Sequence, residues 1–168
     1  MANFIVKVEK DWIYENLRCV VVMTVLGHRC GYVGVPKNHS LYGKKYDEKI
    51  EISEFEKQKF EMSEIGKRGV IPFLLREYIT IDTFFDVHGG ITYADGESNY
   101  PVESDLWWFG YDCAHSGDEK DLSVIDDELK DFFIKYPYPG GVIRTLEYCI
   151  SECESLATQL LKFWEEKI

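Results

Sequence analysis

Two short strings, DVHGGITY and WWFGYDCAHSGD, hold most of the side chains in this sequence that could do chemistry. The first places Asp86 and His88 two positions apart, and the second places Asp112 three positions before His115. Residues two apart on a β-strand point to the same face of the sheet. If the two strings form neighbouring strands, we expect these four side chains to converge.

One hypothesis for this convergence is a metal-dependent hydrolase. Two imidazoles with one or two carboxylates are the ligand set of catalytic zinc, manganese and iron centres, so Asp86, His88, Asp112 and His115 would be the ligands. The spacing matches no HExxH-like motif. The alternative is that each Asp–His pair is a structural hydrogen bond that holds a loop, and this alternative is favoured because both spacings are common by chance.

A second hypothesis makes Cys113 a nucleophile with His88 or His115 as its base. A single cysteine at a strand end more often serves packing. The sequence contains five cysteines, an odd number, and no CxxC spacing, which indicates reduced thiols and gives no support for a structural zinc site.

A third hypothesis is a recognition pocket that needs no reaction and no cofactor. Aromatic rings would stack on a nucleobase, carboxylates would accept hydrogen bonds from ribose hydroxyls, and arginines would meet a phosphate. Strand alternation places Trp107, Phe109 and Tyr111 on one face and Trp108 on the other. The expected ligand-binding residues are Arg29, Tyr32, His88, Tyr93, Trp107, Tyr111, Asp112, His115 and Arg144.

Charge narrows the range of partners. The chain of 168 residues has a formal net charge of -11, which opposes the approach of a phosphate backbone and argues against duplex DNA or RNA. The acidic run at residues 118–131 suggests another alternative, a nucleic-acid mimic that blocks a host protein. That alternative leaves the His, Gly and Trp segments unused.

The sequence shows no targeting or membrane segment. Its first residues lack the basic stretch and apolar run of a signal peptide, and the longest apolar run, at residues 19–25, is too short to span a bilayer. We therefore expect a cytoplasmic protein with no membrane partner.

Hydrophobic patterning predicts an α+β protein with a single domain over residues 1–168, in which a mainly antiparallel sheet packs against a long C-terminal helix. The clearest element is that helix, because apolar residues recur at three-and-four spacing after an N-cap at Thr145. Gly27 and His28 form a predicted turn, and Gly31 and Gly34 suggest a bulge or a close ligand approach. The other predicted elements are strands at 4–8, 18–26, 29–36, 78–87 and 106–113, and a helix or insertion within 51–76 that ends at Gly66 and Gly69.

Several long strings resemble small proteins encoded by phages and prophages. They are HRCGYVGVP, NHSLYG, HGGITYAD, WWFGYDCAHSGD, IRTLEY and ECESLA, and they cover most of the chain except residues 46–76, which we interpret as a variable insertion. Small phage proteins of this size include sponges that sequester nucleotide signals of bacterial immunity. This chain is similar to them in genomic setting and in size, which is an analogy and not a motif match. The preferred hypothesis is therefore a binding protein that captures a nucleotide-derived small molecule in an infected or lysogenic host, with the pocket inside one chain or at a homo-oligomer interface.

Overall fold

The computed structural model describes residues 6–69, 78–137 and 140–167. Its strands are β1 (Lys7–Tyr14), β2 (Leu17–Met23), β3 (Arg29–Val35), β4 (Tyr93–Asp95) and β5 (Trp107–Asp112). Its helices are α1 (Glu54–Arg68), α3 (Ile81–Phe84), the short 3-10 helix η1 (Leu122–Val124), α4 (Asp127–Lys135) and α5 (Leu146–Glu165).

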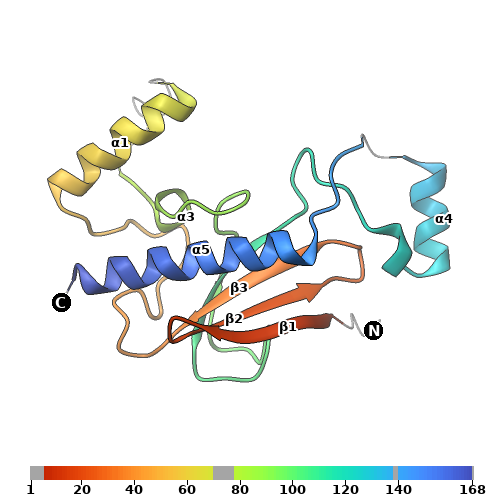
Figure 1. Cartoon of the computed structure of the whole chain (residues 1–168), viewed down its shortest axis with the longest axis horizontal. Coiled ribbons are helices and arrows are strands. Elements are labelled where there is room, and N and C mark those ends of the chain that lie inside the picture. Colours follow the sequence, from red (N-terminus) through yellow and green to blue (C-terminus); the bar gives the residue numbers. More distant parts are fainter. Residues whose placement is uncertain (1–5, 70–77, 138–139, 168) are drawn as a thin grey trace.

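The strands form one five-stranded sheet in the order β1-β2-β3-β5-β4, and every neighbouring pair is antiparallel. The long helix α5 lies across one face of the sheet (Figure 1). This arrangement confirms the predicted α+β fold with an antiparallel sheet against the C-terminal helix. No helix in the described part of the chain has the length and apolar character needed to cross a bilayer.

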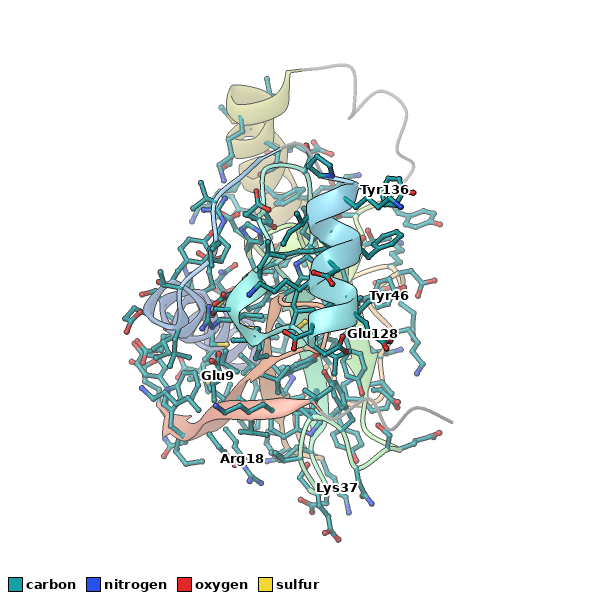
Figure 2. The ribbon with its side chains drawn as sticks, turned by 90° about the vertical axis from the view of Figure 1, so that its right-hand side faces the viewer. Glu9, Arg18, Lys37, Tyr46, Glu128 and Tyr136 are labelled. Atoms are coloured by element: carbon teal, nitrogen blue, oxygen red, sulfur yellow. The ribbon has the colours of Figure 1, made fainter. Side chains whose placement is uncertain are left out.

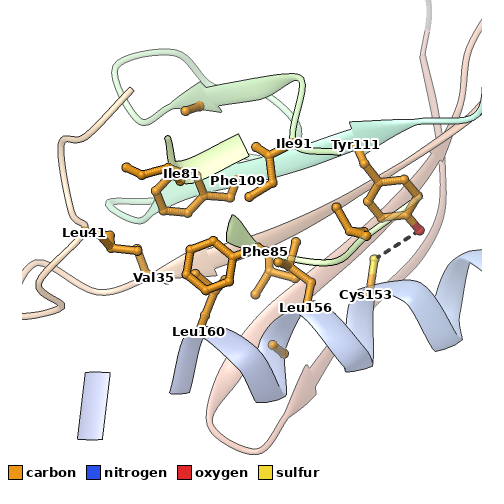
Figure 3. Close-up of a cluster of buried hydrophobic side chains, with 14 of the residues drawn as sticks. Val35, Leu41, Ile81, Phe85, Ile91, Phe109, Tyr111, Cys153, Leu156 and Leu160 are labelled. Atoms are coloured by element: carbon orange, nitrogen blue, oxygen red, sulfur yellow. Dashed lines mark hydrogen bonds between the residues drawn. The ribbon is translucent and has the colours of Figure 1, made fainter. Parts of the chain in front are cut away.

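Helix α5 begins as its sequence predicts. The Thr145 hydroxyl accepts a hydrogen bond from the Tyr148 amide at 3.1 Å, which satisfies one of the free amides of the first turn. Leu156 and Leu160 are fully buried against the sheet, together with Cys153 (Figure 3). Each buried leucine contributes roughly 1.5–3 kcal/mol of hydrophobic stabilisation. The apolar stripe of α5 therefore fixes the helix on the sheet.

The alternation predicted for β5 is confirmed. Trp107, Phe109 and Tyr111 lie in the core beneath α5, whereas Trp108 belongs to a second buried cluster on the opposite face. The Tyr111 hydroxyl donates to the Cys149 carbonyl at 2.8 Å, so this ring is a structural part of the core.

The hairpin of β2 and β3 is also confirmed, with Gly27 at φ +80° in the turn. Gly31 serves a different purpose from the one expected. A Cβ at this position would lie 2.4 Å from the Tyr111 ring, and one at Gly34 would lie 2.7 Å from Leu106. Neighbouring side chains, rather than a ligand or a bulge, occupy the space beside these glycines.

Residues 78–87 are not the strand that their β-branched composition predicted. The segment contains the short helix α3, and its backbone amides bond to a distant loop: Ile81 donates to the Glu48 carbonyl at 3.0 Å and Asp82 donates to the Tyr46 carbonyl at 2.8 Å. These non-local hydrogen bonds replace the strand pairing. They also place α3 beside the 46–50 loop.

Two other boundaries differ from the prediction. Strand β1 covers Lys7–Tyr14 instead of 4–8, where Phe4 lies outside the described residues. Helix α1 begins at a capping box between Ser53 and Glu56 and ends at Gly69, while Gly66 lies inside the helix. The remainder of the predicted 51–76 element, from residue 70 onward, lies outside the described residues.

Candidate functional site

The Asp118 carboxylate connects three loops beside the N-terminal end of α5. Its Oδ2 atom lies 2.7 Å from Nε2 of His88 and accepts the backbone amide of His115 at 3.0 Å. Its Oδ1 atom accepts Nε of Arg144 at 2.8 Å. The Asp118 side chain is only 1% exposed, so its charge is compensated almost entirely by these donors.

His88 has a partner on each ring nitrogen. Because a carboxylate only accepts hydrogen bonds, Nε2 donates to Asp118, and in the neutral imidazole Nδ1 accepts the Tyr148 hydroxyl at 2.8 Å. The backbone amide of His88 donates to Glu152 at 2.7 Å. The imidazole therefore ties its loop to α5, with both ring nitrogens in contact with protein side chains.

The surroundings of Asp118 favour its ionised form. Burial raises the pKa of this carboxyl, but the hydrogen bonds from Arg144, His88 and the His115 amide together hold the pKa below its usual value. Arg144 also lies over the Tyr148 ring, with its guanidinium carbon 4.9 Å from the ring centroid. The Asp118 cluster, defined here as His88, Asp118, Arg144 and Tyr148, is thus a paired charge network.

His115 and Asp112 lie next to this cluster. The His115 ring is 5.8 Å from the His88 ring, and its Nε2 lies 3.5 Å from Asp112 Oδ1. A Cβ on Gly89 would lie 2.0 Å from His115 Nε2, so a glycine with φ +69° is required there. Three of the four converging residues predicted from the sequence, His88, Asp112 and His115, are therefore brought together.

Asp86 is not part of this group, which corrects the expectation that it shares a face with His88. Residues 86–88 are not in a strand, and Asp86 forms an ion pair with Lys67 at 3.3 Å with its side chain 80% exposed. Within the described residues, no group of three or more His, Cys, Asp or Glu side chains is arranged to hold a metal ion. The geometry gives no support to the four-residue metal site.

Cys113 is unsuited to act as a nucleophile. It is buried, and its Sγ lies 3.7 Å from Sγ of Cys149. The hydrogen bond with Cys149 and burial both raise the pKa of the Cys113 thiol, whereas a nucleophilic cysteine needs a lowered pKa. All five cysteines are free and buried.

The predicted aromatic residues do not line one pocket. Trp107 and Tyr111 belong to the core under α5, while Tyr32 and Tyr93 pack edge-to-face on the opposite side of the sheet with ring centroids 5.3 Å apart. The sheet itself separates the two pairs. These four rings therefore do not line one pocket together, because strand alternation places them on different faces of the sheet.

The two predicted arginines lie in internal contacts. Arg29 pairs with Glu9 at 2.6 Å, and both side chains are mostly buried. Arg29 also donates to the Arg144 carbonyl at 2.8 Å, which links the end of β3 to the segment before α5. Arg144 lies beside the start of α5 as expected, but its Nε is committed to Asp118.

A pocket of about 380 Å³ is lined in part by the two glycines of the HGG string and by no residue of the Asp118 cluster. We call it the Gly90 pocket. Its polar lining residues are Tyr46, Glu64, Asp82, Thr83, Asp86 and Thr92, and the backbone of Gly89 and Gly90 completes it. This volume falls within the range typical of small-molecule sites, roughly 300–1,000 Å³.

Asp82 is the most informative residue in this pocket. Its Oδ1 atom is buried and receives no hydrogen bond from any residue that the structure describes. A buried acceptor without a donor costs about 1–3 kcal/mol, so such groups need a reason to persist. Among the described lining residues, three are carboxylates and none is basic.

Thr92 connects the pocket with the predicted site. It lines the Gly90 pocket, and its hydroxyl donates to Asp112 Oδ2 at 2.8 Å. Asp112 therefore holds Thr92 in the pocket wall, and its Oδ1 atom accepts the Ala114 amide at 3.1 Å and lies 3.5 Å from His115 Nε2. The residues that sequence reasoning missed are Asp82, Tyr148, Glu152 and the central role of Asp118. The three-and-four spacing of α5 could have indicated Tyr148 and Glu152, whereas nothing in the local sequence marks Asp82.

Comparisons with family models, with curated proteins and with solved structures found no match to this chain.

Proposed function

We propose that this protein binds a nucleoside-like small molecule in the Gly90 pocket and holds it without chemical conversion. The observation that carries the proposal is that Asp82, a residue that lines a pocket of suitable volume, has a buried Oδ1 atom with no hydrogen-bond donor in the described chain. A ligand hydroxyl or amino group would supply the missing donor.

The charge of the pocket favours one end of such a ligand over the other. Asp82, Asp86 and Glu64 attract hydroxyl and amino donors and repel phosphate. Lys67 lies near the rim, where it contacts Asp86 at 3.3 Å and Glu64 at 3.6 Å. A nucleotide-derived molecule would therefore enter with its ribose or its base, and its phosphates would remain outside.

Binding without catalysis is supported by the state of His88. His88 is not among the residues that line the Gly90 pocket, and its ring nitrogens contact Asp118 and Tyr148 instead, whereas a general base must lie within reach of the substrate. Sequestration of a nucleotide-derived signal in an infected cell is the role that such binding would serve.

Isothermal titration calorimetry with adenosine, ADP-ribose, a cyclic dinucleotide and inorganic phosphate tests the proposal. We expect heat of binding from at least one of the three nucleoside-containing compounds and none from phosphate. Chromatography of the supernatant after heat denaturation should return the bound compound intact. Binding of phosphate alone, no binding of any compound, or recovery of a converted product would overturn the proposal.

A further inference from the structure

Helix α4 and its C-cap residue present an apolar ridge that the described part of the chain covers only in part, since two of its four residues are half-buried and two are exposed. Leu129, Phe132, Phe133 and Tyr136 follow the i, i+3, i+4, i+7 pattern by which helices dock into grooves, and we call them the α4 ridge. No residue of α4 is buried, and Phe132 and Tyr136 are 55% and 58% exposed. Figure 2 looks onto this end of the molecule, with Glu128 and Tyr136 marking the two ends of the helix.

Acidic side chains accompany the ridge. Asp126, Asp127, Glu128 and Asp131 lie within or just before α4, against Lys130 and Lys135. A surface that fits this ridge needs an apolar floor with basic side chains at its rim.

The same chain carries such a surface at its other end. A groove of about 610 Å³ runs between α1 and the C-terminal part of α5, and we call it the α1–α5 groove. Phe55, Phe60 and Phe163 are among its apolar residues. The groove also has a local excess of positive charge, although the chain has a net charge of -11. Its charged lining residues are three lysines and two glutamates: Lys59, Lys162, Lys167, Glu56 and Glu166.

The geometry points to a head-to-tail contact in which the α4 ridge of one copy lies in the α1–α5 groove of a second copy. Helices α1 and α4 lie at opposite ends of the long axis of the molecule (Figure 1), so one copy cannot fill its own groove. A contact between two different surfaces leaves one ridge and one groove free on an open assembly, so copies add to its ends until a ring closes or a filament forms. The ridge is a helix of nine residues, and the net charge opposes association, so the contact is weak and depends on concentration.

Matched variants separate the two surfaces from their surroundings. Phe132→Glu alters the ridge, and Ile134→Glu is its control, because Ile134 is 61% exposed and lies off the ridge on the same helix. Phe55→Glu alters the groove, and Met62→Glu is its control, because both side chains are 76% exposed on α1 and Met62 does not line the groove. All four positions are exposed, so the fold is expected to survive, as circular dichroism would check.

Sedimentation velocity over a concentration series at about 0.15 M salt, where charge is screened beyond roughly 8 Å, provides the test. We expect the sedimentation coefficient of the wild type and of both controls to rise with concentration without a plateau at the dimer. Phe132→Glu and Phe55→Glu should each stay monomeric. A mixture of these two variants should form a 1:1 dimer and nothing larger, because it retains one intact ridge and one intact groove.

Three results would overturn the inference. The first is a wild type that is monomeric at every concentration, which would assign the ridge and the groove to other partners. The second is single variants that associate like the wild type, and the third is a mixture of the two variants that remains monomeric.

Discussion

Oδ2 of Asp118 lies 2.7 Å from Nε2 of His88, in a position where the Asp118 side chain is 1% exposed and the His88 side chain 12%. The same carboxylate receives Arg144 and the His115 amide, so one charge connects the HGG loop, the end of β5 and the segment before α5. This cluster holds His88 of the HGG loop, and the two glycines of the same loop line the Gly90 pocket.

Replacing Asp118 by Asn should destabilise the fold. The NH2 group of Asn cannot accept a hydrogen bond, so at least one of the groups that now donate to the carboxylate would lose its acceptor. Each buried donor left without an acceptor costs about 1–3 kcal/mol of unfolding free energy. Urea denaturation measures the loss, with Asp47→Asn at an exposed position as control. Equal stability of the two variants would show that Asp118 is not a structural centre.

The contribution of Asp118 should depend on pH. Its pKa is lower in the folded state than the value of about 3.9 in an unfolded chain, so its stabilisation is complete above about pH 4 and is lost as pH falls through the folded pKa. The difference in unfolding free energy between the wild type and Asp118→Asn should therefore shrink below about pH 4. A difference that stays constant into strong acid would contradict the assigned ionisation.

His39 should make the fold sensitive to mild acid. It is buried, its Nδ1 accepts the Leu41 amide at 3.0 Å, and its Nε2 faces the Leu160 carbonyl at 3.1 Å. Burial lowers its pKa, although the Leu160 carbonyl opposes this effect. Unfolded chains then bind more protons, so stability should fall as pH drops below about 6.5.

The variant His39→Gln should flatten this part of the stability profile, measured as urea midpoints between about pH 7 and 5. Some slope should remain, because burial also lowers the pKa of His28. An unchanged profile would exclude His39 as its source.

Gly89→Ala should be strongly unfavourable. A Cβ would meet His115 Nε2 at 2.0 Å, and φ of +69° is costly for any residue with a side chain. We expect a loss of about 1–3 kcal/mol from the backbone conformation alone. Gly66→Ala is the matched control, since nothing lies within 4 Å of its Cβ position in helix α1, and it should gain about 0.5–1 kcal/mol.

The double variant Gly89→Ala with His115→Ala separates the two causes. Removing the His115 ring should restore the stability lost to the clash with the new Cβ, while the cost of the positive φ at position 89 remains. Thermal unfolding of the single and double variants would show whether His115 occupies this space.

Sequence reasoning was most accurate where local rules suffice. Helix α5 was predicted because its apolar spacing and the Thr145 cap are local signals, and the faces of β5 followed from alternation. The strand predicted at residues 78–87 was wrong because the amides of Ile81 and Asp82 bond to the backbone of residues 46–48, and the composition of the segment does not encode these distant contacts. The rings expected at the pocket lie on two faces of the sheet for a related reason. Alternation was used to assign faces within β5 but was not extended to β3 and β4, which carry Tyr32 and Tyr93.

The candidate site shows the same division. His88, Asp112 and His115 could be named from their types and positions, but the role of Asp118 depends on three loops that meet only in the folded chain. The unpaired oxygen of Asp82 is a property of packing alone. The single-domain organisation and the insertion at residues 46–76 remain predictions.

The most direct test of the Gly90 pocket is calorimetric titration of adenosine, ADP-ribose and the cyclic dinucleotide, each into the wild type, Asp82→Asn and the exposed control Asp47→Asn. A hydrogen bond to a charged acceptor contributes roughly 1.5–3 kcal/mol, so Asp82→Asn should bind about 10- to 100-fold more weakly. The control should bind like the wild type, and Asp82→Asn should unfold at about the same urea concentration, because the amide has the shape of the carboxylate and leaves a polar atom unpaired at the same position. Equal affinity of all three proteins, or no binding by any of them, would contradict the assignment of the Gly90 pocket as the binding site.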